Sequence, residues 1–330
     1  MASVFNIMLT AIATASTRPR HTTFSIPTVR FPSFVTYICT DNPAVVQLAA
    51  WQQAGINSAL SKNEKVMMSE FNSISCGGVS GISNSFAVGS LWTVDYALQL
   101  ASVGYSAAHI HTREPGIAYN LFAASDQPAN SSSSWTTFSP YYGVLVTAEA
   151  LRSNNGAIVV DLTLGGVNST DQYAGYAVYD ASDKTVQQLV FFNYANVSAS
   201  DNEKITFSIP ESTFPSNTSQ NVVVKYLSGK NGMTETTDIA WGGMTYANVV
   251  DGNLVKSSAS WATASQQVDC SKGCNINVPS PGLAIAFAGG QPDSFTNSSN
   301  KTSLASPQLP ASSGTSSIIL AVLAIWTYLL

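Results

Sequence analysis

The sequence predicts an α/β region followed by an all-β region. Up to about residue 152, apolar runs of strand length alternate with longer segments whose apolar residues recur every three or four positions, the spacing of a helix face. Beyond that point, short runs rich in β-branched and aromatic residues are separated by clusters of Asn, Asp, Ser, Gly and Pro, which is typical of strands and turns. With 45% hydrophobic residues among 330, both regions can bury a core.

Strands and helices alternate in the first region. The predicted elements are, in order, a helix at 43–60, a short buried strand at 65–70 (KVMMSE), a helix at 83–104, a strand at 105–112 (YSAAHIHT) and a helix at 139–152. The helix at 83–104 begins at a cap formed by Ser83 or Ser85 and stops at Gly104. This alternation predicts parallel strands joined by crossover helices.

The second region is predicted to be an antiparallel β-domain, specifically a sandwich, over residues 153–290. Its strand candidates are AIVVDLTL, QYAGYAVYD, VQQLVFFNY, KITFSIP, NVVVKYLS and GLAIAFAG. The run YAVYDASDKTVQQLVFFNY, residues 176–194, has the form of a hairpin, because polar turn residues separate two apolar runs.

The two ends of the chain predict a secreted, surface-attached protein. Residues 1–30 form an atypical start, with an apolar run but no positively charged segment before it. Residues 291–330 are a Ser/Pro/Asn-rich spacer that leads into IILAVLAIWTYLL. That run is shorter than the roughly 20 residues a spanning helix needs. Its order of small residues, polar spacer and short apolar tail fits a GPI-anchor signal, with a hydrophobic membrane tail as the alternative.

Composition predicts an extracellular glycoprotein and excludes a nucleic-acid partner. The net charge of -5 and the pI near 5.1 provide no basic surface to replace counterions. N-x-S/T acceptor sequences for N-glycans begin at Asn130, Asn168, Asn196, Asn217, Asn297 and Asn300. In an oxidising compartment Cys270 and Cys274, close together in DCSKGCN, can form a small disulfide loop. Cys39 and Cys76 can pair or stay as buried thiols.

One short segment carries a specific family resemblance. Glu70 ends a predicted strand and is followed by a polar loop with a cysteine and two glycines, SEFNSISCGG. This segment, with SLWTVDYALQLASVG, AAHIHT, IAYN, YYGVLVTAEAL and finally GLAIAFAGG, resembles glycoside hydrolase family 79, the β-glucuronidase and heparanase-like group. The resemblance covers roughly residues 40–290. It implies that residues 31–152 are the last two or three βα units of a (β/α)8 barrel, in which catalytic groups lie at the carboxyl ends of strands.

The resemblance assigns roles to particular residues. It implies that Glu70 is the nucleophile of a retaining glycosidase, a role that suits a carboxylate because it can attack an oxocarbenium-like carbon and leave again. It places Gly77, Gly78 and Tyr119 where the family holds the carboxylate of a glucuronide-type substrate; glycines let backbone N–H groups approach an anion closely. Phe71 departs from the family, which has a small threonine there. No cofactor is implied.

Other chemistry-bearing residues have plainer explanations. His109 and His111 alternate on one strand and therefore share a side. No third metal ligand accompanies them, so lining of the barrel or a hydrogen bond to substrate is expected in place of a metal site. Glu114 in HTREPG stands beside Arg113, which predicts a surface ion pair. Trp135, Trp241 and Trp261 are candidates for stacking on sugars, although aromatic residues of β-domains are mostly core.

The second carboxylate of a retaining mechanism is expected to be missing. Two carboxyl groups about 5 to 5.5 Å apart are required, yet the only acids before Glu70 are Asp41 and Glu64, and Glu64 stands at the start of a strand. About 150 residues precede the β-domain, whereas a whole barrel takes about 250. We therefore expect a truncated β-glucuronidase-like hydrolase that is inactive alone. The alternatives are a noncatalytic cell-surface glycoprotein whose β-domain contacts carbohydrate, and an intact enzyme with Glu114 as acid.

Overall fold

The computed structural model describes most of the chain between residues 42 and 289. The described residues are 6–7, 42–123, 136–153, 155–164, 173–195, 204–214, 221–247 and 253–289. All of them belong to one compact unit, Met1–Thr10 with Thr28–Gln291; the other unit, Ala11–Pro27 with Pro292–Leu330, lies outside the described residues. The predicted glycosylation asparagines, Cys39, Trp135 and the C-terminal tail lie outside them too. No helix within these ranges has the length and apolar character to span a membrane.

The first region contains a small parallel sheet. Strand β2 (Val66–Phe71) pairs in parallel with β3 (Tyr105–Ile110), which pairs in parallel with β1 (Asn6–Ile7). The parallel pairing was predicted correctly. The prediction that β2 is a buried strand was wrong, because Met67 is 58% exposed. The physical reason is that Val66, Met68 and Phe71 pack against the helices on one face of the sheet, whereas Met67 points to the opposite face and joins no core cluster of the described residues.

The helix predicted over residues 43–60 is divided. The structure has α2 (Asn42–Ala50) and α3 (Gln53–Ser61), separated by a turn at Trp51. Trp51 is 58% exposed, so the apolar residues of this segment do not form one continuous buried face. The apolar spacing correctly predicted helical structure but not this interruption.

The crossover from β2 to β3 begins as a π-helix. Element η1 (Phe86–Trp92) continues directly into α4 (Thr93–Val103). Both predicted ends are found: the Ser85 side chain accepts a hydrogen bond from the Val88 N–H, and Gly104 adopts φ 112° after the last turn. The wide turn of η1 was not predicted.

Helix α5 (Ser139–Ala150) packs tightly against η1. A Cβ atom at Gly89 would lie 2.8 Å from Cδ of Pro140, and one at Gly143 would lie 2.6 Å from the Gly89 carbonyl oxygen. The two glycines therefore permit a backbone approach that any side chain would prevent.

The second region is antiparallel, as predicted. Its main sheet has nine strands in the order β13-β12-β11-β10-β16-β8-β7-β6, with β14 also on β10. The strands are β6 (Ala157–Asp161), β7 (Tyr173–Asp180), β8 (Val186–Asn193), β10 (Asn221–Gly229), β11 (Ile239–Trp241), β12 (Met244–Thr245), β13 (Val255–Lys256), β14 (Gln266–Asp269) and β16 (Gly282–Phe287). Strands β7 and β8 form the predicted hairpin. Separate pairs join β9 (Lys204–Ile209) with β15 (Cys274–Pro279) and β4 (Phe122–Ala123) with β5 (Thr136–Thr137).

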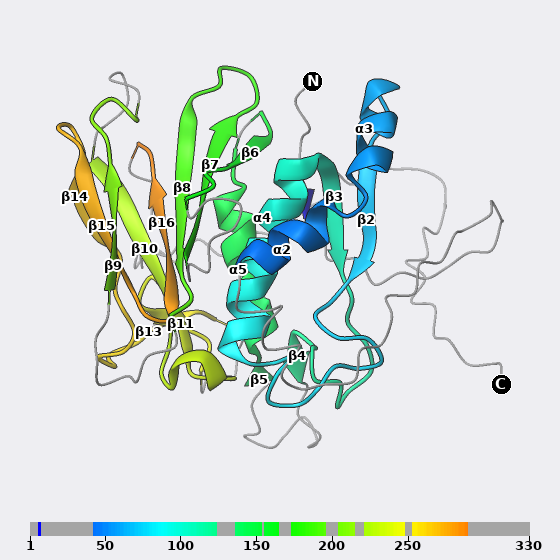
Figure 1. Ribbon diagram of the computed structural model, residues 1–330. Helices are drawn as coiled ribbons and strands as arrows, with labels where there is room; N and C mark the ends of the chain where they lie inside the picture. Colours follow the sequence, from blue (N-terminus) through cyan, green and yellow to red (C-terminus); the bar gives the residue numbers. More distant parts are fainter. Residues whose placement is uncertain are drawn as a thin grey trace, which may run out of the picture. The chain divides into compact units, whose positions relative to one another are not determined.

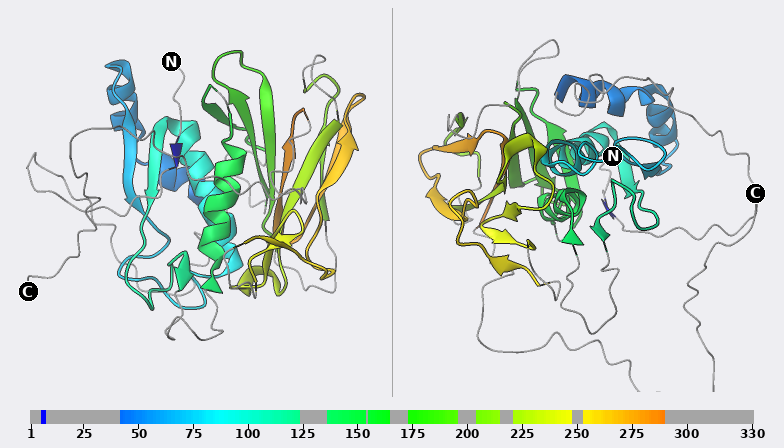
Figure 2. Two further views of the ribbon diagram at one scale, coloured as in Figure 1. Left: turned by 180° about the vertical axis from the view of Figure 1, so that it is seen from behind. Right: turned by 90° about the horizontal axis from the view of Figure 1, so that it is seen from below.

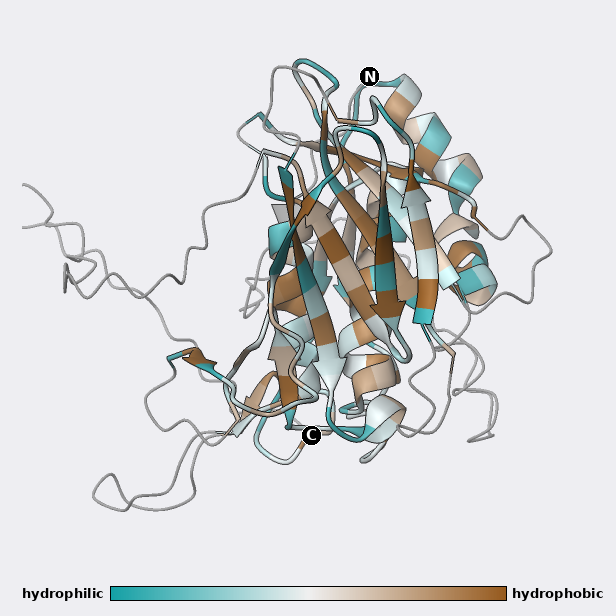
Figure 3. Cartoon of the chain, turned by 90° about the vertical axis from the view of Figure 1, so that its left-hand side faces the viewer, coloured by the Kyte–Doolittle hydropathy of each residue, from teal (hydrophilic) through white to brown (hydrophobic). Residues whose placement is uncertain are grey.

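The nine-stranded sheet is covered on both faces. Along β7 and β8, Tyr176, Val178, Val190 and Phe192 belong to the core cluster that includes α4 and α5, which we call the helix-side core. The alternate residues Ala177, Leu189 and Phe191 join β9 and β15 in a second cluster, the strand-side core. Figures 1 and 2 show the helices on one face and the β9–β15 pair on the other. The two-residue alternation is visible as bands of hydropathy along the strands in Figure 3.

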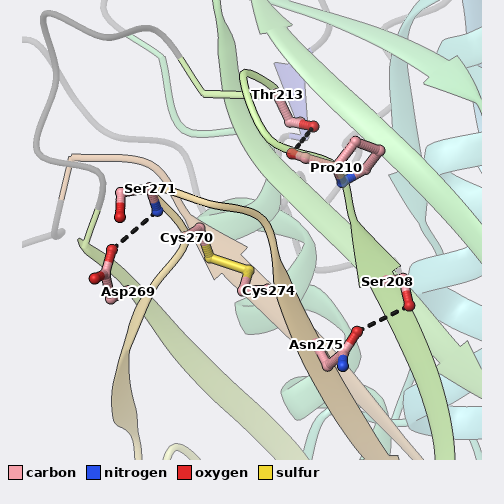
Figure 4. The surroundings of a disulfide bond; sticks show 8 residues. All are labelled: Ser208, Pro210, Thr213, Asp269, Cys270, Ser271, Cys274 and Asn275. Atoms are coloured by element: carbon pink, nitrogen blue, oxygen red, sulfur yellow. Dashed lines mark hydrogen bonds between the residues drawn. A yellow bond between two sulfur atoms is a disulfide. The ribbon is translucent and has the colours of Figure 1, made fainter.

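A disulfide closes the turn before β15. Cys270 and Cys274 are bonded, with an S–S distance of 2.05 Å. Figure 4 shows the neighbouring polar contacts: the Ser271 N–H donates to Asp269 at 2.9 Å, and the Ser208 hydroxyl donates to the Asn275 side chain at 2.8 Å. Cys270 itself is buried in the strand-side core.

Candidate active site

Glu70 lies next to His111 at the carboxyl ends of two parallel strands. Glu70 is the penultimate residue of β2, and His111 follows β3 directly. The His111 N–H donates to the Phe71 carbonyl oxygen at 2.9 Å, which aligns the strand ends. Nδ1 of His111 is 3.8 Å from Oε1 of Glu70, and 65% of the Glu70 side chain is exposed. The carboxylate is thus accessible to a ligand.

The Asn72 side chain connects the ends of β2 and β3 beyond their last backbone hydrogen bond. Its amide Nδ2 donates to the His111 carbonyl oxygen at 2.7 Å, and its Oδ1 accepts from the Ser73 N–H at 2.7 Å. Asn72 was not among the site residues predicted from the sequence. Its position in the Glu-x-Asn-Ser run was the available signal.

Phe71 points away from the Glu70 carboxylate. Because side chains alternate along a strand, it faces the helices, where its ring lies 5.5 Å from that of Tyr96 and 6.3 Å from that of Trp92. The large Phe71 side chain therefore packs against the helices and does not occupy the side of the strand that carries the Glu70 carboxylate.

The glycine loop has an unusual backbone. Cys76, Gly77 and Gly78 have successive φ values of 60°, 99° and 75°, in the left-handed region that favours glycine. At Gly78 an added Cβ would lie 2.6 Å from Oγ of Ser83 and 3.0 Å from Cδ1 of Tyr119. The loop therefore passes directly against the Tyr119 ring.

Tyr119 connects the loop with the Glu70 neighbourhood. It is 2% exposed, and its ring centroid is 5.8 Å from that of His111. Burial raises the pKa of Tyr119; the Arg113 guanidinium and a hydrogen bond from the Gly77 backbone oppose this, and the Glu70 charge adds to it. The phenol therefore stays protonated and can act as a hydrogen-bond donor. The predicted residues Glu70, Gly77, Gly78 and Tyr119 do lie in one neighbourhood.

Asn120 organises the loop that carries Arg113. Its Oδ1 accepts from the Thr112 hydroxyl and from the Arg113 N–H, both at 2.9 Å, and its Nδ2 donates to the Glu114 carbonyl oxygen at 2.8 Å. Arg113 and Glu114 form an ion pair at 2.9 Å between largely exposed side chains. Asn120 was not predicted from the sequence as a structural support of this site.

The other residues that the sequence suggested as candidates do not contact Glu70 in the described structure. Glu64 precedes β2, so the length of that strand puts it roughly 20 Å from Glu70 at about 3.3 Å per residue. His109 has a buried Nδ1 without a hydrogen-bond partner among the described residues. Trp241 is buried at 1% exposure, whereas Trp261 is half-buried and lines a cleft described below.

Comparison with known proteins shows that this chain is similar to glycoside hydrolases. The description "Glycosyl hydrolase family 79 C-terminal beta domain" matches residues 175–285. A β-glucuronidase of Neurospora crassa is 29% identical over 215 residues, which are 57% of this chain and 37% of that protein. The chain thus spans well under half the length of this relative.

A solved structure has the same fold over much of the chain. It is a 4-O-α-L-rhamnosyl-β-D-glucuronidase of Fusarium oxysporum 12S, with a TM-score of 0.59 and 18% identity, matched over 77% of this chain and 50% of that one. The predicted resemblance to glycoside hydrolase family 79 is confirmed, because residues 175–285 match that family's C-terminal β domain and the curated relative is a β-glucuronidase.

Proposed function

We propose that this chain is the C-terminal part of a retaining, β-glucuronidase-like glycoside hydrolase, with Glu70 as its nucleophile. The observation that carries the proposal is the exposed Glu70 carboxylate at a parallel strand end, with His111 and Tyr119 beside it. In this proposal β2, β3 and their helices are the last units of a (β/α)8 barrel, and residues 153–290 are its β-sandwich companion domain.

The proposed chemistry is attack of a Glu70 oxygen on the anomeric carbon. A C–O bond forms to Glu70 as the bond to the leaving oxygen breaks, and water later hydrolyses the glycosyl ester. His111, 3.8 Å from the carboxylate, would hold it in position. Tyr119, a donor whose pKa is raised by burial, and the loop of Gly77 and Gly78 would receive the carboxylate of a glucuronide.

We further propose that the chain does not turn over glucuronides by itself, because neither Glu64 nor Glu114, the two candidate acids among the described residues, is placed to protonate the leaving group. Glu64 lies at the far end of β2, and Glu114 is engaged with Arg113. Neither is placed to meet Glu70 across the scissile bond, at the spacing of about 5 to 5.5 Å that retention requires.

Covalent trapping tests the nucleophile without needing the acid. A 2-fluoro-glucuronide with a dinitrophenolate leaving group requires no proton for departure, so Glu70 should acquire a fluoroglucuronyl ester detectable by peptide mass spectrometry. Glu70→Gln should abolish labelling, and Glu64→Gln and Glu114→Gln should not. Labelling that persists in Glu70→Gln would refute the nucleophile. Catalytic hydrolysis of a nitrophenyl glucuronide that requires Glu70 would refute the claim of inactivity.

The cellular location is also a proposal. The sequons beginning at Asn130, Asn168, Asn196, Asn217, Asn297 and Asn300, together with the spacer and apolar tail of residues 291–330, support an N-glycosylated protein at the cell surface. Release of the native protein from membranes by a phosphatidylinositol-specific phospholipase supports the GPI anchor, and retention in the membrane after this treatment favours a hydrophobic tail.

A further inference from the structure

A cleft lies in the β-domain, and no residue of the Glu70 site lines it. This β-domain cleft has a volume of about 890 Å³, within the range of roughly 300 to 1,000 Å³ seen for small-molecule sites. The residues that matter here are Tyr226, Ser228, Lys204, Lys230, Gln266 and Trp261. Tyr226 belongs to the strand-side core, so the nine-stranded sheet separates this part of the cleft from the helices.

The cleft combines an aromatic surface with an unpaired donor. Trp261 is half-buried, which leaves part of its indole available to a ligand. Ser228 is only 8% exposed, and its buried hydroxyl has no hydrogen-bond partner in the described structure. Leaving such a group unpaired is unfavourable, so a polar ligand that reaches Ser228 would satisfy it.

The polar rim favours a negatively charged group. Lys204 is exposed and forms no ion pair within the described ranges. Lys230 pairs with Asp238 at 2.8 Å while 51% of its side chain stays exposed. The hydrogen bond to Asp238 raises the pKa of Lys230, so this side chain is cationic at neutral pH. Asp238 pairs with Lys230 and the Glu235 charge also acts on it, so the attraction for an anion depends mainly on the exposed Lys204 ammonium.

The Gln266 amide adds to the polar lining of the cleft. Nε2 of Gln266, an exposed residue of β14, donates to the Tyr226 hydroxyl, which leaves its carbonyl oxygen available as an acceptor. A flat apolar ring bordered by hydroxyl, amide and ammonium groups matches a pyranose, which has apolar C–H faces and a rim of hydroxyls.

We propose that the β-domain cleft is a noncatalytic binding site for an oligosaccharide that contains uronic acid. Trp261 stacks against a sugar face, Ser228 and Gln266 bond sugar hydroxyls, and Lys204 and Lys230 attract the carboxylate. The proposal does not depend on the role of Glu70, because no residue of that site lines the cleft. Such a site would hold an acidic polysaccharide independently of hydrolysis.

Calorimetric titration of the whole chain tests the proposal with two probes, a uronic acid tetrasaccharide and a neutral glucose tetrasaccharide of the same length. We expect tighter binding of the acidic probe. Trp261→Ala should weaken it about tenfold or more, because the aromatic surface is lost. Lys204→Gln should weaken the acidic probe roughly three- to fivefold, as expected for an exposed ion pair, and leave the neutral probe unchanged.

The controls separate this site from Glu70 and from misfolding. Trp51→Ala changes an exposed tryptophan outside the cleft, and Glu70→Gln alters the other site; both should bind like the wild type. Lys204→Gln changes an exposed side chain and should keep the wild-type melting temperature. Unchanged affinity in both Trp261→Ala and Lys204→Gln overturns the site, and equal affinity for the two probes overturns the uronic acid assignment. Loss of binding in Glu70→Gln would assign the ligand to the other site.

Discussion

The Tyr194 hydroxyl, just beyond β8, donates a hydrogen bond of 2.8 Å to Oδ2 of Asp95 in α4. Tyr176 of β7 donates to the other carboxylate oxygen, and the Asn42 amide donates to both at 3.1 and 3.2 Å. Asp95 is fully buried, and burial raises its pKa from 3.8 to about 6 although these hydrogen bonds lower it. One carboxyl group thus joins the helices to the nine-stranded sheet.

Asp95 should make stability depend on pH between about 4 and 6. Because its folded pKa lies above the unfolded value, the folded state binds the proton more tightly. Its stabilising contribution is therefore complete below about pH 4 and is lost as the pH rises through 6, a change of roughly 3 kcal/mol. Urea unfolding at pH 4 to 7 should show the difference between wild type and Asp95→Asn decreasing over this interval.

Asp180 provides the control for this titration. Hydrogen bonds from Ser153 and Ser182 hold the pKa of Asp180 below its usual range, so its contribution is present above the unfolded pKa and is lost only in stronger acid. The difference between wild type and Asp180→Asn should be nearly constant from pH 5 to 7. If the Asp95→Asn difference is equally constant, the Asp95 assignment is wrong.

The Asp95 cluster also shows what local sequence could and could not predict. Ser85 and Gly104 identified the ends of a helix because caps act on adjacent residues. The partners of Asp95 are 53, 81 and 99 residues away, so no local pattern relates them. Similarly, an apolar run predicted the strand at β2 but not its exposure, which depends on what packs against each face of the sheet.

At the candidate site, the sequence supplied residues and the fold supplied their neighbours. The strand-end position singled out Glu70, and the family resemblance supplied its role together with those of Gly77, Gly78 and Tyr119. The supports Asn72 and Asn120 were missed because a single Asn has many local roles, including turns and caps. Their function here comes from bonds between segments that the parallel pairing and the loop bring together.

The Lys225–Glu149 ion pair should contribute strongly to stability. Nζ of Lys225 on β10 is 2.9 Å from Oε2 of Glu149 on α5, and the side chains are 7% and 16% exposed. Glu149→Gln leaves a buried ammonium without its counter-charge, so we expect a loss of roughly 3 kcal/mol in the free energy of unfolding. Glu114→Gln breaks a largely exposed pair and should cost less than about 1 kcal/mol.

Adding Lys225→Met to Glu149→Gln should restore part of that loss. The second substitution removes the uncompensated charge and places an apolar chain beside Trp241 and Phe287, rings that Lys225 now overlies at 5.9 and 5.7 Å. Chemical denaturation of the two single variants and the double variant gives the coupling energy. Additive losses would show that the pair does not act as a unit.

The Cys270–Cys274 disulfide should provide a modest stabilisation. The cysteines are four positions apart, and a loop this short limits the entropy removed from the unfolded chain to about 2 kcal/mol. We expect the double variant Cys270→Ser, Cys274→Ser to lose about that amount in urea unfolding, and a reductant to reproduce the effect in the wild type. Cys76→Ser, which changes an exposed free thiol, is the control and should show little change.

Gly78 and Gly81 offer a matched test of the loop beside Tyr119. Their φ values are nearly equal, 75° and 78°, but an added Cβ at Gly78 meets Ser83 and Tyr119 within 3.0 Å, whereas one at Gly81 meets nothing within 4 Å. Both alanine variants incur the left-handed strain of about 1 to 2 kcal/mol. Gly78→Ala must in addition displace Ser83, whose hydroxyl accepts from the Val79 N–H at 3.0 Å.

We therefore expect Gly78→Ala to lose at least about 1 kcal/mol more than Gly81→Ala in the free energy of unfolding. The imidazole NMR signals of His111, whose ring lies 5.8 Å from that of Tyr119, should shift in Gly78→Ala and not in Gly81→Ala. Trapping of Glu70 by the fluoroglucuronide should slow in the same variant. Equal losses and unchanged His111 signals in both variants would show that the contact between the glycine loop and Tyr119 does not shape the Glu70 site.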